Sequence, residues 1–263
     1  MDIDRSKPHI ARMYDWYLGG ENNYEADREH AARVETAFPS VGLAARVNRA
    51  FMHRATRWLA SRGIRQFLDL GSGIPTEPNL HQVAQAAAAE SRVVYVDNDP
   101  TVLTHARTLL ISSQEGRTAF VDADVRAPQA ILDADALRTT LDLSSPVAVS
   151  LTALLHFIPD GQHPNEILGT LMDAVPSGSY LVLTQATADF DPDAFARIEQ
   201  IYASGGIDAR FRTRAEFEGF FTGLELADPG IEVPHRWHPE TPSAEGDDLD
   251  AQVSFYAGVA RKP

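Results

Sequence analysis

The sequence predicts an α/β fold in which a mostly parallel sheet carries helices on both faces. Five nearly continuous apolar runs, typical of strands buried on both faces of a parallel sheet, lie at 65–70, 92–96, 118–121, 146–151 and 179–184. The segments between these strands are long enough for helices, which we expect at 78–90, 101–112, 128–141 and 164–175. Because strands alternate with helices, the connections fit right-handed βαβ crossovers.

The pattern of residues 1–62 predicts helices. Apolar side chains at helical spacing predict helices over 10–18, 24–37 and 42–62, and these end near Gly19, Pro39 and Gly63. We therefore expect an N-terminal helical cover or lid at 1–62 and a Rossmann-like domain at 63–263, forming one compact unit.

The segment after Thr184 changes pattern again. Asp191 and the proline after it suit the cap and first turn of a helix ending near Ala203. Thr213 and Glu216 have capping-box spacing. Two more strands are expected, over 224–234 and 253–260, and between them a polar, acidic loop at 239–250.

Composition narrows the classes of function. The 263 residues include no cysteine, which fits a cytoplasmic protein without disulfides or thiolate metal sites. The formal net charge of −14 disfavours a nucleic-acid partner, since binding to phosphate backbones needs a basic face. No apolar run is long enough to span a membrane, and the first residues lack the layout of a signal peptide. We expect no membrane partner.

The most informative segment is FLDLGSGIPT at residues 67–76. Two glycines after a strand let the backbone approach a ligand and offer amides at a helix N-terminus. Dinucleotide-binding loops add a third glycine, but here Pro75 stands beside that position. Asp69 precedes Gly71 and Gly73, where it would repel a pyrophosphate. The turn therefore favours a ligand with a positive amino group.

Two further acids follow the next strands. Asp97 ends the second strand, where its carboxylate can accept from both ribose hydroxyls, although Asp99 is a rival that could instead cap a helix. Asp124 follows the third strand and suits the adenine amine, with the Val125 amide donating to a ring nitrogen; Asp122 is its rival. With Asp69, these acids match adenine, ribose and amino acid, the three parts of S-adenosylmethionine.

Several segments resemble one protein family. The Asp69 turn, Asp97 and Asp124 look like the motifs of class I S-adenosylmethionine-dependent methyltransferases. Residues 11–24 (ARMYDWYLGGENNY), 27–28 (DR), 213–217 (TRAEF), 229–230 (PG) and 254–261 (SFYAGVAR) resemble the actinobacterial S-adenosyl methyltransferase family, formerly described as a domain of unknown function.

The resemblance covers nearly the whole chain. It implies a seven-stranded sheet with an antiparallel last strand, a helical N-terminal cover, and methyl transfer from S-adenosylmethionine, giving S-adenosylhomocysteine, to a small-molecule acceptor. The predicted cofactor-binding residues are Asp69, Gly71, Ser72, Gly73, Asp97, Asn98, Asp124, Val125, Leu151, Tyr14 and Asn23. The acceptor and the oligomeric state do not follow from the family.

The catalytic residues are less defined. Tyr14 and Tyr17 lie on an apolar helix face, where they either pack in the core or form a lid over the methionine end. His156 follows the fourth strand and is either a general base or a structural residue; Tyr17 is the other candidate for a base. His163, His235 and His238 lack metal-ligand spacing, so no metal is expected.

Two other functions compete with methyl transfer. A nicotinamide-dependent oxidoreductase would use the same kind of sheet, but the acid before the glycines argues against it. A non-catalytic protein that binds S-adenosylmethionine or S-adenosylhomocysteine would share every cofactor motif. Only an acceptor site distinguishes an enzyme from such a binder.

Overall fold

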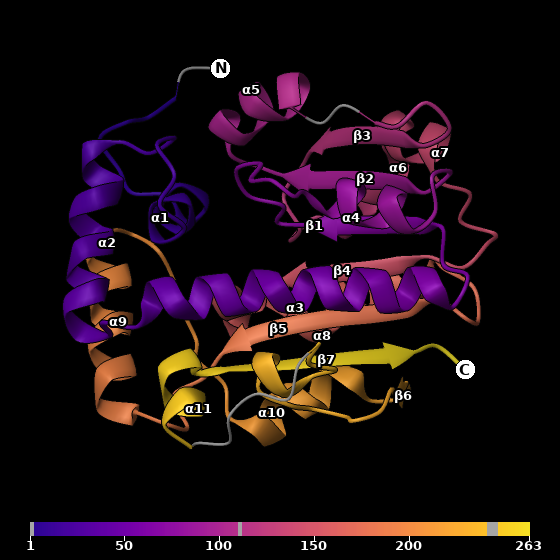
Figure 1. Ribbon diagram of the computed structural model, residues 1–263. Helices are drawn as coiled ribbons and strands as arrows, with labels where there is room; N and C mark the ends of the chain where they lie inside the picture. Colours follow the sequence, from indigo (N-terminus) through magenta and orange to yellow (C-terminus); the bar gives the residue numbers. More distant parts are fainter. Residues whose placement is uncertain (1–2, 110–111, 241–246) are drawn as a thin grey trace.

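The computed structural model describes residues 3–109, 112–240 and 247–263. Its strands form one sheet of seven, in the order β3-β2-β1-β4-β5-β7-β6 (Figure 1). The strands are β1 (Gln66–Leu70), β2 (Arg92–Asp97), β3 (Arg117–Asp122), β4 (Ala148–Thr152), β5 (Tyr180–Ala186), β6 (Glu225–Leu226) and β7 (Phe255–Arg261). The first five are parallel, while β7 pairs antiparallel with both β5 and β6. This confirms the predicted α/β fold.

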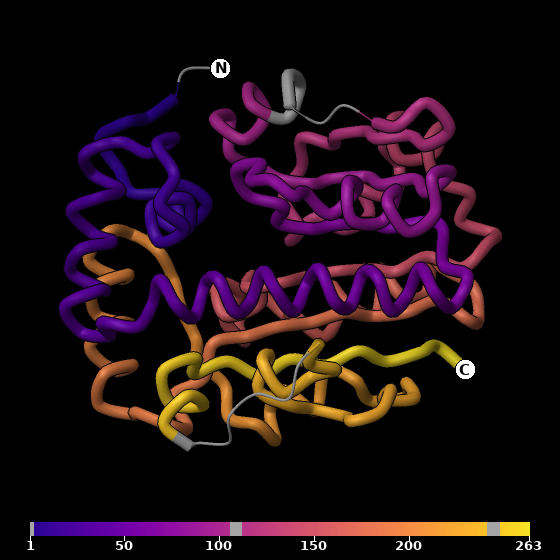
Figure 2. The backbone as a smooth tube through the Cα atoms, viewed as in Figure 1, coloured from indigo at the N-terminus to yellow at the C-terminus, as the bar shows by residue number. Residues whose placement is uncertain are grey.

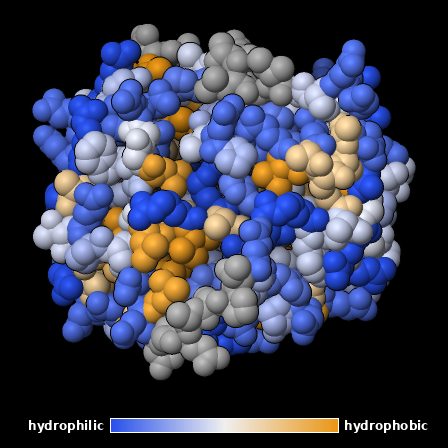
Figure 3. Space-filling model, viewed as in Figure 1, coloured by the Kyte–Doolittle hydropathy of each residue, from blue (hydrophilic) through white to orange (hydrophobic). Residues whose placement is uncertain are grey.

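Alternate residues of each strand pack on opposite faces of the sheet, which explains the continuous apolar runs. Phe67 of β1 packs with Phe51 and Leu59 of α3 (Val41–Ser61). Its neighbour Leu68 belongs to the core on the other face. In Figure 1, α3 and α4 (Leu80–Ala87) lie across the front of the sheet. The space-filling view in Figure 3 is largely hydrophilic on this side, with apolar side chains gathered near the amino-terminal half of α3.

The remaining helices complete the layers. Several contribute to the core behind the sheet: α6 (Pro128–Asp133), α7 (Asp135–Thr140), α8 (Pro164–Asp173) and α10 (Arg214–Glu218). The helix α5 (Pro100–Leu109) lies beside β3. Short 3-10 turns η1 (Leu155–Phe157), η2 (Asp160–Gln162), η3 (Gly219–Phe221) and η4 (Pro234–Arg236) connect other elements. No helix among these described segments is long and apolar enough to cross a membrane.

The N-terminal helices meet the carboxyl ends of the parallel strands. In Figures 1 and 2, α1 (Ile10–Tyr17) and α2 (Glu25–Ala37) lie at that end, beside α9 (Pro192–Ser204). A third apolar core joins them, with Met13, Val34 and Phe195 among its buried members. Segments far apart in the sequence therefore close over one edge of the sheet.

Three local expectations were wrong. The helix over 128–141 is two helices, because Ala134 between α6 and α7 has extended backbone angles. The strand over 224–234 has only two residues in β6, since Pro229 follows it and cannot donate a ladder hydrogen bond. Of the expected loop at 239–250, residues 241–246 lie outside the described residues, and Asp247–Val253 forms α11 where a loop and a strand start were expected.

Candidate active site

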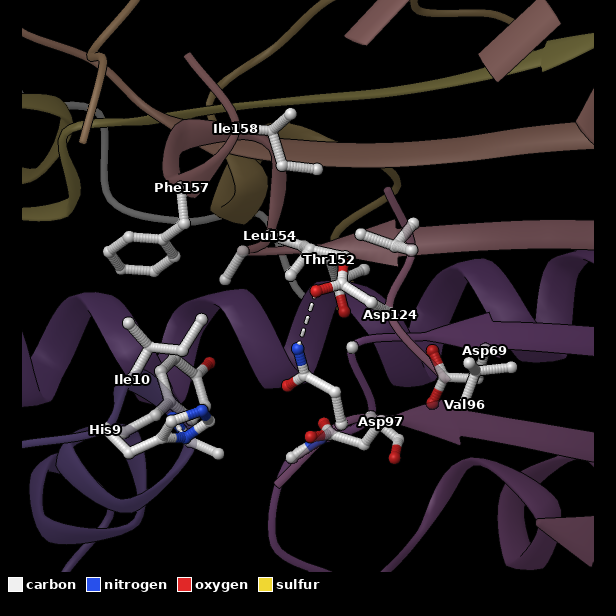
Figure 4. A pocket seen from close by; sticks show the side chains of 18 of the residues that line it. His9, Ile10, Asp69, Val96, Asp97, Asp124, Thr152, Leu154, Phe157 and Ile158 are labelled. Atoms are coloured by element: carbon white, nitrogen blue, oxygen red, sulfur yellow. Dashed lines mark hydrogen bonds between the residues drawn. The ribbon is translucent and has the colours of Figure 1, made fainter. Parts of the chain in front are cut away.

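A pocket lies between β1 and β4, where the order of the strands in the sheet reverses. Ligands of open α/β sheets bind at such switch points, outside the carboxyl ends of the strands. Asp69, Asp97 and Asp124 all line it, and Figure 4 shows them around one opening, with His9 and Ile10 of the N-terminal segment facing them. We call it the first pocket. The predicted residues Gly71, Ser72, Gly73, Asn98, Val125 and Tyr14 also line it.

The glycine turn is fixed by its hydrogen bonds to β2. The amides of Gly71 and Ser72 donate to the Val96 carbonyl, at 2.8 and 3.2 Å. Gly71 has a φ of +68°, and a Cβ there would lie 2.7 Å from Leu154. The position therefore requires glycine on both grounds.

One expectation about this turn was wrong: it does not lead directly into a helix N-terminus. A loop separates Gly73 from α4, which begins only at Leu80. The Gly73 amide instead donates to Asp97 Oδ2, at 2.8 Å. The turn therefore orients the acid of the neighbouring strand.

Asp97 is held in place at the end of β2. Its two oxygens accept from the amides of Gly73 and Asp99, at 2.8 and 3.0 Å. Burial raises the pKa of Asp97, and these backbone donors only partly offset that effect. A buried carboxylate fixed in this way and facing a pocket suits a pair of ligand hydroxyls.

The rival Asp99 does not line the first pocket. It accepts from the Thr101 amide at 2.7 Å and lies 2.8 Å from His9 Nδ1. Asp99 therefore caps α5 and anchors the segment before α1, the structural role that was its alternative.

Asp69 is buried at the end of β1. Burial, together with the nearby charge of Asp97, raises its pKa to about 7, although Arg49 acts in the opposite direction. Arg49 comes from α3, lines the first pocket, and donates to the carbonyls of Thr76 and Pro78. A cationic ligand beside this carboxyl would lower its pKa again, because a positive charge favours the ionised form.

Asp124 has protein partners already. Arg126 donates to it from Nε and Nη2, at 2.9 and 2.7 Å, and Asn98 Nδ2 donates at 3.0 Å, the dashed line of Figure 4. Burial acts to raise the pKa of Asp124, but the Arg126 hydrogen bonds outweigh it and the pKa is lowered. The rival Asp122 does not line the first pocket.

A second pocket adjoins the first. Ile10, Tyr14, Ala153 and Phe157 line both. The Tyr14 hydroxyl donates to the Ala45 carbonyl at 3.1 Å and accepts from Asn48 Nδ2 at 2.9 Å. Tyr14 is therefore a fixed part of the wall between the two pockets.

Both candidate bases line the second pocket and not the first. His156 is buried, and burial together with Arg212 lowers its pKa to about 3. Its Nδ1 accepts from the Ala186 amide at 3.4 Å, so the neutral ring carries its hydrogen on Nε2. Burial also raises the pKa of Tyr17 well above its usual value. Neither group suits proton abstraction at neutral pH.

Two predicted cofactor residues lie elsewhere. Asn23 is buried outside both pockets, where its amide donates to Asp15 Oδ2 and the Gly20 carbonyl, at 2.8 and 2.9 Å. It shapes the loop after α1. Leu151 is fully buried in the core, because the pleat of β4 directs its side chain to a covered face of the sheet. The residues that follow it, 152–154, line the first pocket instead.

Sequence reasoning missed several residues of the first pocket: His9, Asn48, Arg49, Met52, Arg126 and Phe157. Most lie on α3, in η1 or just before α1, outside any strand-end motif. The sequence offered one clue to these residues: Asn48 and Arg49 are polar, although they belong to a helix that was predicted from its apolar side chains. Within the described part of the chain, no group of three or more histidines and acids could hold a metal ion.

Comparison with known proteins gives a consistent result. The S-adenosyl methyltransferase family matches residues 1–263. A DUF574 family protein from Streptomyces avermitilis is 48% identical, with 100% of both chains covered and a TM-score of 0.96. A proposed methyltransferase from Thermobifida fusca YX is 39% identical, with 98% of this chain and 96% of that chain covered and a TM-score of 0.90.

More distant structures share only the fold. The plantazolicin methyltransferase BpumL, in complex with SAH and a triazolic analog, is 11% identical over 96% of each chain, with a TM-score of 0.55. None of the curated proteins matches the chain. The resemblance expected from residues 11–24 and the strand-end acids is confirmed by the family that matches the whole chain. The protein belongs to the S-adenosyl methyltransferase family and is an S-adenosylmethionine-dependent methyltransferase.

Proposed function

We propose that the protein binds S-adenosylmethionine in the first pocket and transfers its methyl group to a small molecule held in the second. The observation that carries the proposal is the order of the acids. Asp124, Asp97 and Asp69 lie at or just after the carboxyl ends of β3, β2 and β1, which are consecutive in the sheet. Adenine, ribose and methionine are consecutive in the cofactor, so one extended ligand can contact all three.

Each part of the cofactor then has a matching group. Asp97 accepts from the ribose hydroxyls, and Asp124 with the Val125 amide holds adenine. Asp69 binds the ammonium group of the methionine end, and Arg49 offers its carboxylate a partner. Asn98 and Arg126, which already contact Asp124, orient that acid.

The chemistry needs little from the protein beyond alignment. The bound sulfonium cofactor supplies an electrophilic methyl group. Ile10, Tyr14, Ala153 and Phe157, which line both pockets, set the direction of approach and keep water away from the reacting atoms. Such positioning can lower a barrier by about 7–11 kcal/mol in well-oriented reactions. The second pocket also favours an enzyme over a non-catalytic binder, because it is a cavity of about 60 Å³ that adjoins the first pocket.

Calorimetry with S-adenosylmethionine and S-adenosylhomocysteine tests the proposal. Asp97→Ala should weaken binding by about 1.5–3 kcal/mol, the range for a hydrogen bond to a charged group, or about 10- to 150-fold. The matched control is Asp122→Ala, an exposed acid of the neighbouring strand outside the first pocket, which should leave the affinity unchanged. Equal affinity of the two variants, both shown to be folded, would refute the ribose role.

The cytoplasmic location and the absence of nucleic-acid and membrane partners stay predictions from composition. The oligomeric state stays open. A screen of metabolites with methyl-labelled cofactor is the direct way to find the acceptor.

A further inference from the structure

The second pocket lies beyond the methionine end of the proposed cofactor site. In the sheet order β3-β2-β1-β4-β5, strands β4 and β5 come after β1, so their carboxyl ends lie beyond the proposed methionine end on the same edge. Ala153 follows β4 and Ala186 ends β5, and both line the second pocket. A molecule there would face the end of the cofactor that carries the methyl group.

The lining carries no charge. Among the described residues, the side chains that line the second pocket include no aspartate, glutamate, lysine or arginine. Its histidine, His156, is neutral because burial and Arg212 lower its pKa to about 3. A charged acceptor would lose its hydration without gaining a partner, which is strongly unfavourable.

The walls are aromatic and meet edge to face. The rings of Phe195 and Phe211 lie 4.8 Å apart at 81°, and those of Phe157 and Tyr202 lie 5.2 Å apart at 84°. Phe38 is 5.4 Å from Phe195 on another side. Walls of this kind present ring faces and edges to a further ring, which aromatic pairs favour beyond their buried area.

One polar group in this lining is poorly hydrogen-bonded. Tyr17 is 7% exposed, and apart from an interaction with the nearby Tyr202 hydroxyl its own hydroxyl makes no hydrogen bond to a described residue. It neighbours the Tyr202 hydroxyl, and burial raises the pKa of Tyr202 to about 12, so both phenols keep their protons. A buried donor without a partner is destabilising, and a ligand oxygen or nitrogen would satisfy it.

We propose that the second pocket is the acceptor site and selects a small, neutral aromatic molecule whose polar atom accepts a hydrogen bond from Tyr17. The inference rests on the proposed function, which places the cofactor in the first pocket. Tyr17 and Tyr202 line only the second pocket, away from the residues that line both. The polar atom that Tyr17 holds is therefore distinct from the atom that is methylated.

The methyl transfer needs no base from the protein. A lone pair on the acceptor's heteroatom forms the new bond to the methyl carbon, the bond from that carbon to sulfur breaks, and its electron pair stays on sulfur. A phenolic acceptor releases its proton to water. A ring nitrogen with a free lone pair needs no proton release before attack, so the acceptor class comprises phenols and nitrogen heterocycles that carry a second polar atom for Tyr17.

Three single-ring probes test the pocket: phenol, toluene, which has the same shape without a hydrogen-bonding group, and benzoate, which is charged. Binding is measured by ligand-observed NMR titration of the full chain saturated with S-adenosylhomocysteine. Phenol should bind about fivefold more tightly than toluene, the value of one neutral hydrogen bond, and benzoate at least about tenfold more weakly than phenol. Tyr17→Phe should remove the preference for phenol over toluene.

A blocking variant separates the two proposals. Val34 of α2 lines the second pocket but not the first, so Val34→Phe should abolish binding of phenol and toluene while the cofactor affinity stays unchanged. Val34→Ile is the conservative control. With labelled cofactor, the wild type should methylate neutral phenols or nitrogen heterocycles and not their carboxylated analogues.

The outcomes are distinct. If S-adenosylhomocysteine does not bind, the proposed function fails. If it binds but benzoate matches phenol, or Val34→Phe leaves phenol binding intact in a folded protein, the proposed acceptor site is wrong while the cofactor site stands. Retention of the preference for phenol in Tyr17→Phe would remove the role of that hydroxyl.

Discussion

Binding of S-adenosylhomocysteine should weaken as the pH falls below neutrality, through Asp69. Burial is the main cause that raises the pKa of this carboxyl to about 7, and the nearby Asp97 adds to it. In the proposed site, the ionised form binds the ammonium group of the ligand. Protonation removes that charge, so the affinity is fully present above the pKa and is lost as the pH falls through it.

The size of the effect follows from that pKa. If only the ionised form binds, the apparent dissociation constant is raised by a factor equal to the reciprocal of the ionised fraction of Asp69. A pKa of about 7 makes this factor about 11 at a pH of about 6 and about 1.3 at a pH of about 7.5. The affinity should therefore fall about eightfold between these conditions.

Calorimetry gives two readouts of the same event. Titrations at about pH 6 in buffers of different ionisation enthalpy should show the release of about one proton per ligand bound, because Asp69 is mostly protonated before binding. Asp69→Asn should bind more weakly at about pH 7.5 and lose the proton release. An affinity that is constant over this range, or an Asn variant that keeps the eightfold change, would refute the reasoning.

Three further predictions concern the glycine turn, the two tyrosines and Asn23. Gly71→Ala should lower the free energy of unfolding by about 1–3 kcal/mol in urea denaturation, because its φ is +68° and a Cβ would lie 2.7 Å from a leucine side chain. Gly73→Ala has similar backbone strain but open space, so an equal cost would contradict the steric argument. Tyr14→Phe should lower the free energy of unfolding by about 1–3 kcal/mol, because the buried Asn48 amide loses its acceptor. Tyr17→Phe should not lower the melting temperature. The reverse order would be inconsistent with the hydrogen bonds described. Asn23→Ala should lower the free energy of unfolding by about 1 kcal/mol and leave the cofactor affinity nearly unchanged. A large loss of cofactor affinity would instead assign Asn23 to the cofactor site.

The strand-end acids were predictable because their positions depend on local sequence and one topological rule. A buried strand followed by an acid fixes the acid at a strand end, and parallel strands bring those ends to one edge. Asp69, Asp97 and Asp124 accordingly line a single pocket. Sequence reasoning left Asp99 and Asp122 open as rivals, and only the structure places both outside that pocket.

Residues outside the strands were not predictable in the same way. Asn23 follows a glycine pair, which suggested a ligand, yet its amide donates to Asp15 of the preceding helix α1. His156 follows a strand and suggested a base, yet burial and the charge of Arg212 lower its pKa and keep its ring neutral. In both cases a partner or environment that no local pattern shows decides what the side chain can do.

By itself, the sequence determined the α/β sheet, the glycine turn and the acids that suit the cofactor, because each depends on periodicity or on neighbours along the chain. Only the tertiary structure forms the second pocket, where we propose that the acceptor binds. Tyr14 of α1 meets Asn48 of α3, and Tyr17 meets Tyr202 of α9, because apolar faces from distant segments pack into one core. The second pocket exists where that packing is incomplete, and such a space has no signature in a linear pattern.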